Sequence, residues 1–241
     1  VNFFMTPSKE TQIIEGSPQF PGPRQRETKF ESSLLSPTTK KGNEVNKLLT
    51  HPVVDGLDNL VTTAIIDTDS TNTDLGFIAG IIDIETEKFP DIAGKTTAGS
   101  GHDAHGMMQI KTSTATQPGF NLPTIFDVAD KYNVSYNKAL AKEARDQMEA
   151  NYIANKPIEP VKGKAGKQVV RLLQDPKLNV AFGVTLLNYY LDVYEGDKEL
   201  AALGFNQGKD ISDAYAKDPS YKIPSEGAGY IEKAKKRGLF N

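Results

Sequence analysis

A glutamate that shares one face of a predicted helix with apolar side chains is the residue best placed for chemistry in this chain. Leu75, Ile78, Ile82, Glu85 and Phe89 recur at intervals of three and four residues, so they face one side of a helix. A carboxyl on such a face is removed from water, and burial favours its protonated form. We therefore expect the pKa of Glu85 to be raised, as a general acid requires.

The expected ends of this helix place Glu85 in its last turn. Asn-Thr-Asp at residues 72–74 offers good N-cap residues, and Pro90 is a stop signal. The negative end of the helix dipole also favours a protonated carboxyl. Asp83 and Glu87 are predicted to lie on the opposite face, in solvent. The alternative interpretation of Glu85 is a structural glutamate that pairs with a lysine or caps a loop.

Four motifs follow one another from residue 85 to residue 231. The first comprises Glu85-Thr86, Phe89-Pro90, residues 98–101 (Ala-Gly-Ser-Gly), residues 106–110 (Gly-Met-Met-Gln-Ile) and Thr114-Ala115. The second is Asp175-Pro176 with Asn179 and Gly183, and the third is Gly196-Asp197 with residues 200–208. The fourth is Glu226 with Tyr230 and Ile231. In this order they resemble the SLT-type lytic transglycosylases of the lysozyme superfamily. The resemblance implies a mostly α fold, α+β and lysozyme-like, with a small β element.

The resemblance also implies a reaction. It is cleavage of the β-1,4 bond between N-acetylmuramic acid and N-acetylglucosamine in peptidoglycan, with the muramyl 6-hydroxyl forming a 1,6-anhydro end. A single glutamate, Glu85, serves first as acid and then as base. A hydrolase of the muramidase type would instead need a second carboxylate within about 5 to 10 Å, and Asp91 and Asp103 are the candidates. The scheme needs no cofactor.

Six side chains are candidates for contacts with the glycan strand. They are Met108, Gln109, Phe205, Asn206, Gln207 and Tyr230. The Gln109 amide suits sugar hydroxyls and N-acetyl groups, and Asn206 suits the acetamido group. Met108 offers an apolar face to a pyranose ring. Tyr230 lies near the acid in the resembling family, whereas Phe205 replaces the family's usual tyrosine and keeps only its ring. A packing or capping role is the alternative for each.

Two polar segments are less specific. His102 and His105 flank Asp103 at a spacing that could hold a metal, but a third ligand is missing, since His51 is the only other histidine and there is no cysteine. We therefore predict no metal site and polar loop residues near the cleft. Residues 163–167, Gly-Lys-Ala-Gly-Lys, lack the spacing of a phosphate loop and are expected to form an exposed basic loop.

Composition narrows the classes of function. The 241 residues carry a net charge of −3, which gives no electrostatic reason to expect nucleic-acid binding. No apolar run approaches the roughly 20 residues that span a bilayer, so no transmembrane segment is predicted. The opening Val-Asn-Phe-Phe-Met is too short for a signal peptide, and we expect no Sec export signal.

The chain is predicted to have two parts. Residues 1–46 are rich in proline, serine and threonine and are expected to form an extended arm, either a flexible tail or a segment that orders against a partner. Residues 47–241 form the lysozyme-like domain, with a helical insertion at about 117–168. Helices are predicted at 125–132, from Ser135 as cap to 154, from Pro176 onward, and at about 198–205 and 226–237; weak strand signals occur only between 92 and 112.

The Gly-Met-Met-Gln and Asn-Gln-Gly motifs resemble in particular the virion-associated lytic transglycosylases of short-tailed phages. This implies a protein carried in the virion and delivered to the bacterial periplasm, where it opens the cell wall locally for genome passage. The arm would then dock on other virion proteins. The alternatives are a catalytically inactive structural virion protein with a lysozyme-like fold, and a glycan-binding module.

Overall fold

The computed structural model describes residues 57–68, 73–86, 103–117, 119–154 and 159–240. All of them belong to one compact unit, assigned to residues 37–241. The arm predicted at 1–46 and the residues Phe89, Asp91 and His102 lie outside the described ranges.

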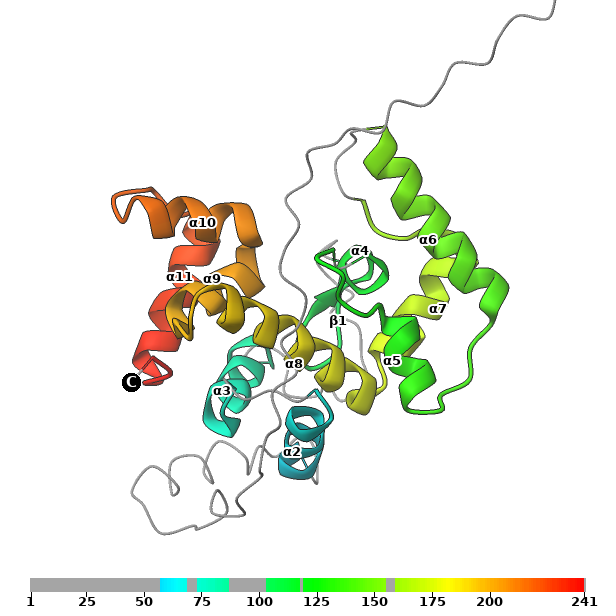
Figure 1. Ribbon diagram of the computed structural model, residues 1–241, viewed down its shortest axis with the longest axis horizontal. Helices are drawn as coiled ribbons and strands as arrows, with labels where there is room; N and C mark the ends of the chain where they lie inside the picture. Colours follow the sequence, from blue (N-terminus) through cyan, green and yellow to red (C-terminus); the bar gives the residue numbers. More distant parts are fainter. Residues whose placement is uncertain (1–56, 69–72, 87–102, 118, 155–158, 241) are drawn as a thin grey trace, which may run out of the picture. The chain divides into compact units, whose positions relative to one another are not determined.

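Helices dominate the described residues, which confirms the predicted mostly α fold with a small β element (Figure 1). The helices are α2 (Leu57–Asp67), α3 (Leu75–Thr86), α4 (Thr112–Thr116), α5 (Ile125–Lys131), α6 (Lys138–Ile153), α7 (Gly163–Leu173), α8 (Pro176–Val193), α9 (Lys198–Gln207), α10 (Lys209–Lys217) and α11 (Ser225–Lys236). The strands β1 (Ala104–His105) and β2 (Ile110–Lys111) form an antiparallel pair in which His105 lies opposite Ile110. Within the described ranges, no helix combines the length and apolarity that a bilayer crossing requires.

Helix α8 is the centre of the core. Its start follows from the sequence, because the Asp175 side chain accepts hydrogen bonds from the backbone N–H groups of Lys177 (2.9 Å) and Leu178 (3.2 Å), and Pro176 occupies the first turn. Eleven of its residues are buried, on more than one face, as expected of a helix enclosed by other elements. Accordingly α8 packs against α2, α5, α7 and α9 (Figure 1).

The region predicted as an insertion contains α5, α6 and most of α7. Helix α5 begins with a capping box between Thr124 and Asp127. The N-cap of α6 is Asn137, whose side chain accepts hydrogen bonds from two backbone N–H groups, so the prediction of Ser135 as cap was wrong by two residues. Both residue types cap helices well, and the choice depends on where the chain turns.

Residues 163–167 are not a loop but the first turns of α7, which corrects the prediction made for them. Lys164 and Lys167 are exposed, whereas Ala165 and Gly166 are buried. A Cβ on Gly166 would lie 2.0 Å from the carbonyl oxygen of Val161, so glycine permits this close approach. The lysines therefore occupy the solvent face of an amphipathic helix. The short helix α10 was not predicted.

Gly183 of the buried helix α8 contacts Met108, which belongs to the Gly-Met-Met-Gln-Ile segment at residues 106–110. The Met108 side chain is fully buried. A Cβ on Gly183 would lie 2.2 Å from the Met108 sulfur atom and 3.1 Å from the Met108 Cβ. The absence of a side chain at Gly183 therefore lets the Met108 segment approach α8 closely.

We predict that Gly183→Ala lowers the free energy of unfolding by about 1–3 kcal/mol, because the added methyl group overpacks a filled site. Urea unfolding measures the change. The matched control is Gly229→Ala, also in a helix, where an added Cβ meets nothing within 4 Å; this variant should be neutral or more stable by up to about 1 kcal/mol. Equal stability of the two variants would contradict the packing argument.

Candidate active site

Helix α3 holds Glu85 in its last turn, as predicted. The Asp74 side chain accepts a hydrogen bond from the Phe77 backbone N–H (2.7 Å), which satisfies a free donor at the start of the helix. Glu85 itself is half-buried, and the flanking Ile84 and Thr86 are buried. The carboxyl group thus lies at the end of a helix that is apolar on most of its surface.

The opposite face of α3 is covered, not solvated, which corrects the prediction for Asp83. The Asp83 carboxylate forms an ion pair with Arg237 at 2.5 Å, and both side chains are largely buried. One turn earlier, a Cβ on Gly80 would lie 2.2 Å from the Leu239 side chain. Helix α11 and the residues after it therefore pack on α3. Ile81 and Ile84, which lie off the predicted stripe, are buried as well.

Burial raises the pKa of the Glu85 carboxyl from its ordinary 4.5 to about 7. The Tyr230 hydroxyl opposes this shift by favouring the carboxylate. Two nearby charges have smaller and opposite effects, since Glu226 raises the pKa and Lys233 lowers it. A carboxyl with this pKa retains its proton in a large share of molecules at neutral pH, as a general acid requires.

Tyr230 of α11 is the residue that the structure brings directly to Glu85. Its side chain is buried, and its pKa is raised well above the ordinary value, first by burial and then by the charge of Glu85. The two groups interact, but not with the geometry of a full hydrogen bond, and the hydroxyl has no other hydrogen-bond partner among the described residues. Tyr230 is therefore a neutral donor adjacent to the carboxyl.

The end of α9 contacts the helix that carries Tyr230. The Gln207 side chain donates a hydrogen bond to Asn206 Oδ1 (2.7 Å). A Cβ on Gly227 of α11 would lie only 2.7 Å from Gln207 Cγ, so glycine lets the two helices approach closely here. Phe205, Asn206 and Gln207 are all half-buried, and Phe205 packs against the core. The packing of α9 on α11 thus connects these three predicted residues to the Tyr230 helix.

Asn179 of α8 holds the turn that carries Gln109. Its side-chain oxygen accepts a hydrogen bond from the Met108 backbone N–H (2.8 Å), and its Nδ2 donates to the His105 carbonyl oxygen (3.0 Å). A side chain at Gly106 would collide with Asn179, and Gly106 adopts a φ of +73° that favours glycine. The Gln109 amide then donates to the Gly106 carbonyl oxygen (2.6 Å).

Met108 and Asp103 are engaged inside the protein. Met108 is 0% exposed, so the structure gives it the packing role that was the alternative to a sugar contact. Asp103 accepts hydrogen bonds from the Thr112 backbone N–H (2.9 Å) and hydroxyl, and its other oxygen lies 2.8 Å from His105 Nε2. No group of three or more potential metal ligands occurs among the residues that the structure describes.

Sequence reasoning missed two basic side chains at the end of α11: Lys233, which acts on the Glu85 carboxyl, and Arg237, the C-cap, which pairs with Asp83. Tyr230, Lys233 and Arg237 are separated by three and four residues, which places them on one face of the helix. This spacing was visible in the sequence, but nothing local identified α3 as the partner of that face. The clamping role of Asn179 was equally invisible, because its two partners lie more than 70 residues away.

Residues 155–223 match the family described as Transglycosylase SLT domain. The match covers less than a third of the chain; it contains Asn179 and the end of α9, whereas Glu85 and Tyr230 lie outside it. It supports a relationship to the lytic transglycosylases and a peptidoglycan-directed activity in general. The comparisons with curated proteins and with solved structures each gave no significant match.

We predict that Asn179→Ala destabilises the protein by about 2–4 kcal/mol, because it leaves a buried N–H and a buried carbonyl group without partners. Thermal or urea unfolding measures the effect. Asn151→Ala, at a half-buried position near the end of α6, is the control and should change stability by less than about 1 kcal/mol. An Asn179→Ala protein as stable as the control would exclude the proposed clamp.

The pKa of Glu85 predicts how stability depends on pH. Because the folded-state pKa lies above the ordinary value, Glu85 does not weaken the fold below pH 4.5, and its ionisation progressively weakens it as the pH rises through 7. The stability of Glu85→Gln relative to the parent protein should therefore increase between pH 4.5 and pH 8.5, by at most about 3 kcal/mol. Urea unfolding at several pH values tests this, with the exposed Glu149→Gln as control; a constant difference for Glu85→Gln would contradict it.

Proposed function

We propose that this protein is a peptidoglycan lytic transglycosylase with Glu85 as its acid and base. The observation that carries the proposal is the half-buried Glu85 carboxyl, whose pKa is raised to about 7 beside the neutral hydroxyl of Tyr230. The match of residues 155–223 to the Transglycosylase SLT domain gives independent support.

In the proposed reaction, protonated Glu85 donates its proton to the glycosidic oxygen as the bond from that oxygen to the muramyl anomeric carbon breaks. The muramyl 6-hydroxyl oxygen then bonds to the same carbon, and its proton passes to the Glu85 carboxylate. Tyr230 stabilises that carboxylate between the two transfers by donating a hydrogen bond. Each turnover ends with Glu85 protonated again, and no water is consumed.

Two groups of side chains are proposed to hold the glycan strand. Gln109 lies in the turn fixed by Asn179, and Phe205, Asn206 and Gln207 lie at the end of α9 beside α11. Amide groups suit the hydroxyl and acetamido groups of amino sugars. We do not assign Met108 to this set, because its side chain has no exposed surface.

We do not assign to Asp103 the role of the second carboxylate that a hydrolase would need. Both of its oxygens take part in interactions with Thr112 and His105, so this carboxylate supports the β1–β2 turn. Asp91, the other predicted candidate, lies outside the described residues. A muramidase-type hydrolase therefore remains the alternative reaction at the same site, and analysis of the products decides between them.

We further propose that the protein is a phage virion component that is delivered to the bacterial periplasm and opens the wall for genome entry. The resemblance of Gly106–Gln109 and Asn206–Gly208 to virion-associated enzymes supports this, and residues 1–46 would contact other virion proteins. Mass spectrometry of purified particles tests it, and absence of the protein from them would contradict it. An inactive virion protein with a lysozyme-like fold is the second candidate.

We predict that Glu85→Gln lowers the rate of peptidoglycan cleavage by about 10²–10⁴-fold, because glutamine keeps the shape of the side chain but carries no transferable proton. Release of soluble fragments from purified sacculi measures the rate. Glu87→Gln, two residues away in the sequence, is the matched control and should retain activity. Mass spectrometry of fragments from the parent protein should show 1,6-anhydro ends, which are lighter by one water than hydrolytic ends.

The outcomes separate the candidate functions. Equal cleavage by Glu85→Gln and the parent protein would exclude Glu85 as the acid. Hydrolytic ends with Glu85-dependent cleavage would identify a muramidase. Absence of cleavage by a folded parent protein would favour the inactive structural role.

A further inference from the structure

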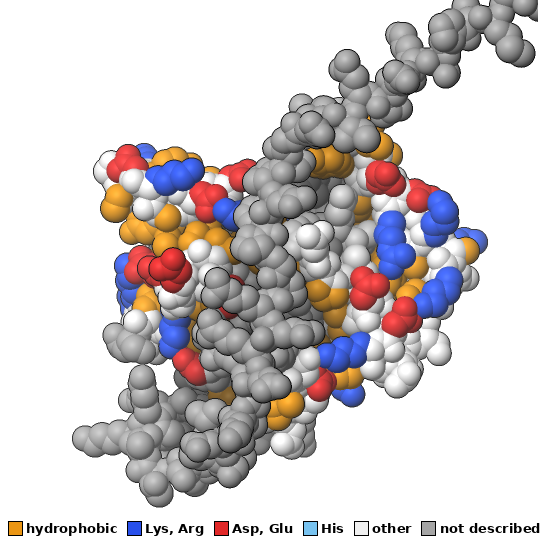
Figure 2. Space-filling model, in the orientation of Figure 1, with side chains coloured by type: hydrophobic (Ala, Val, Ile, Leu, Met, Phe, Trp, Pro, Cys, Tyr) orange, Lys and Arg blue, Asp and Glu red, His pale blue; other side chains and the backbone are white. Residues whose placement is uncertain are grey.

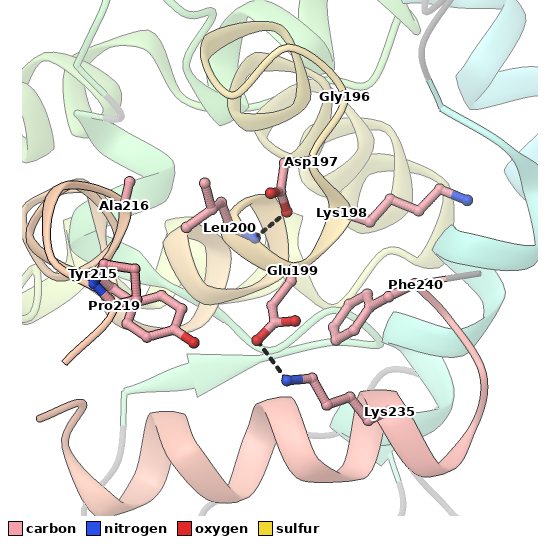
Figure 3. A pocket seen from close by; sticks show the side chains of 10 residues that line it. All are labelled: Gly196, Asp197, Lys198, Glu199, Leu200, Tyr215, Ala216, Pro219, Lys235 and Phe240. Atoms are coloured by element: carbon pink, nitrogen blue, oxygen red, sulfur yellow. Dashed lines mark hydrogen bonds and ion pairs between the residues drawn. The ribbon is translucent and has the colours of Figure 1, made fainter. Parts of the chain in front are cut away.

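A cavity of about 690 Å³, whose lining does not include Glu85, lies where the start of α9, the end of α10 and the end of α11 meet (Figure 3). Its lining residues come from these three helices, from the turn after α10 and from the segment after α11. They include Asp197, Lys198, Glu199, Tyr215, Lys235 and Phe240. Its size is that of a site for a small molecule or a short oligomer.

The polar centre of the cavity is an ion pair between two aromatic rings. Glu199 and Lys235 are 2.7 Å apart, and Figure 3 shows Tyr215 on one side of this pair and Phe240 on the other. The side chains of Glu199 and Lys235 are 26% and 55% exposed, so a ligand can reach both. The cavity thus combines a hydrogen-bond acceptor and a donor with two apolar ring surfaces.

The walls of the cavity are fixed by hydrogen bonds. Asp197 caps α9 by accepting from the Leu200 backbone N–H (2.9 Å), and Ser212 of α10 donates to the Leu200 carbonyl oxygen (2.7 Å). In the turn that carries Pro219, Asp218 accepts from the Ser220 backbone N–H (2.9 Å). Little ordering is therefore required when a ligand binds, which lowers the cost of association.

The charges that line the cavity balance one another. Lys198 pairs with Asp74 outside the lining, and Asp197 caps α9, so the charged centre is the Glu199–Lys235 pair, whose two charges offset each other. Such a site suits a neutral molecule that both donates and accepts hydrogen bonds. A sugar ring has this character, because its hydroxyl groups bind polar atoms while its C–H faces pack on aromatic rings.

We propose that this cavity is a second saccharide site, which binds N-acetylglucosamine units of a glycan strand apart from the reaction at Glu85. Such a site would keep the protein on the wall while the proposed site at Glu85 releases its product. That the natural ligand is wall glycan rests on the proposed function, whereas saccharide binding by the cavity does not.

The experiment is a titration of isotopically labelled, full-length Glu85→Gln protein with tri-N-acetylchitotriose, followed by two-dimensional NMR. We expect shifts of the Gly196, Lys198, Tyr215 and Phe240 amide signals. Adding Tyr215→Ala should weaken binding at the cavity by about tenfold, the effect expected when a central aromatic contact is lost. Glu199→Gln, a milder change, should also weaken it. Tyr221→Ala, an exposed tyrosine outside the cavity, is the matched control and should bind like its parent.

If the saccharide shifted only amide signals at the C-terminal ends of α3 and α9, near Glu85 and Gln207, the proposal would be overturned. Equal binding by the Tyr215→Ala and Tyr221→Ala proteins would also overturn it. Binding of the dipeptide D-alanyl-D-alanine in place of the sugar would also overturn it, because the cavity would then recognise a zwitterion. Cavity binding in a protein that cleaves no peptidoglycan would leave this inference standing and remove only the catalytic proposal.

Discussion

The removal of the Glu85 carboxyl from water is the interaction on which the proposed chemistry depends, and it is produced by the packing of α11 on α3. Helix α3 is apolar on more than one face, so covering only the predicted stripe would leave Ile81 and Ile84 exposed. Helices α2 and α11 both pack on α3, and the Asp83–Arg237 ion pair joins α3 to the residue that follows α11. Residues of this last helix also act on the pKa of Glu85, which Glu226 raises and Tyr230 and Lys233 lower.

Helix α8 positions the residues that are proposed to contact the glycan. Near its start, Asn179 and Gly183 fix the Met108–Gln109 turn, and near its end Tyr190 packs on Gly204 of α9, where glycine permits a close approach. The two sets of proposed glycan contacts therefore depend on one buried helix. Figure 2 shows that the part of the surface formed by α5 and α6, in contrast, carries acidic and basic side chains side by side. A rigid element that positions polar groups from several segments limits their movement relative to one another, which is what a catalytic site requires.

The sequence predicted those features that depend on neighbouring residues. The spacing of Ile78, Ile82 and Glu85 gave the face of α3 on which the acid lies, and Asp175-Pro176 gave the start of α8. It failed where a distant partner decides the outcome: Asp83 resembles a solvated aspartate until Arg237 is placed beside it. Residues 163–167 resemble a basic loop for the same reason, because the partner that buries Gly166 is a backbone carbonyl rather than an apolar side chain.

The match to the SLT family and the proposed acid lie in different parts of the chain, and the packing is what relates them. Residues 155–223 contain α8 and α9, which hold the groups proposed to bind glycan, but not Glu85 or Tyr230. Helix α11 contacts both α9 and α3, so the helix carrying Tyr230 lies against the matched segment as well as against the acid. The half-buried Glu85 carboxyl lies at this junction beside Tyr230, and its ionisation weakens the fold as the pH rises through its pKa. This cost of placing a carboxyl here agrees with the catalytic role proposed for Glu85.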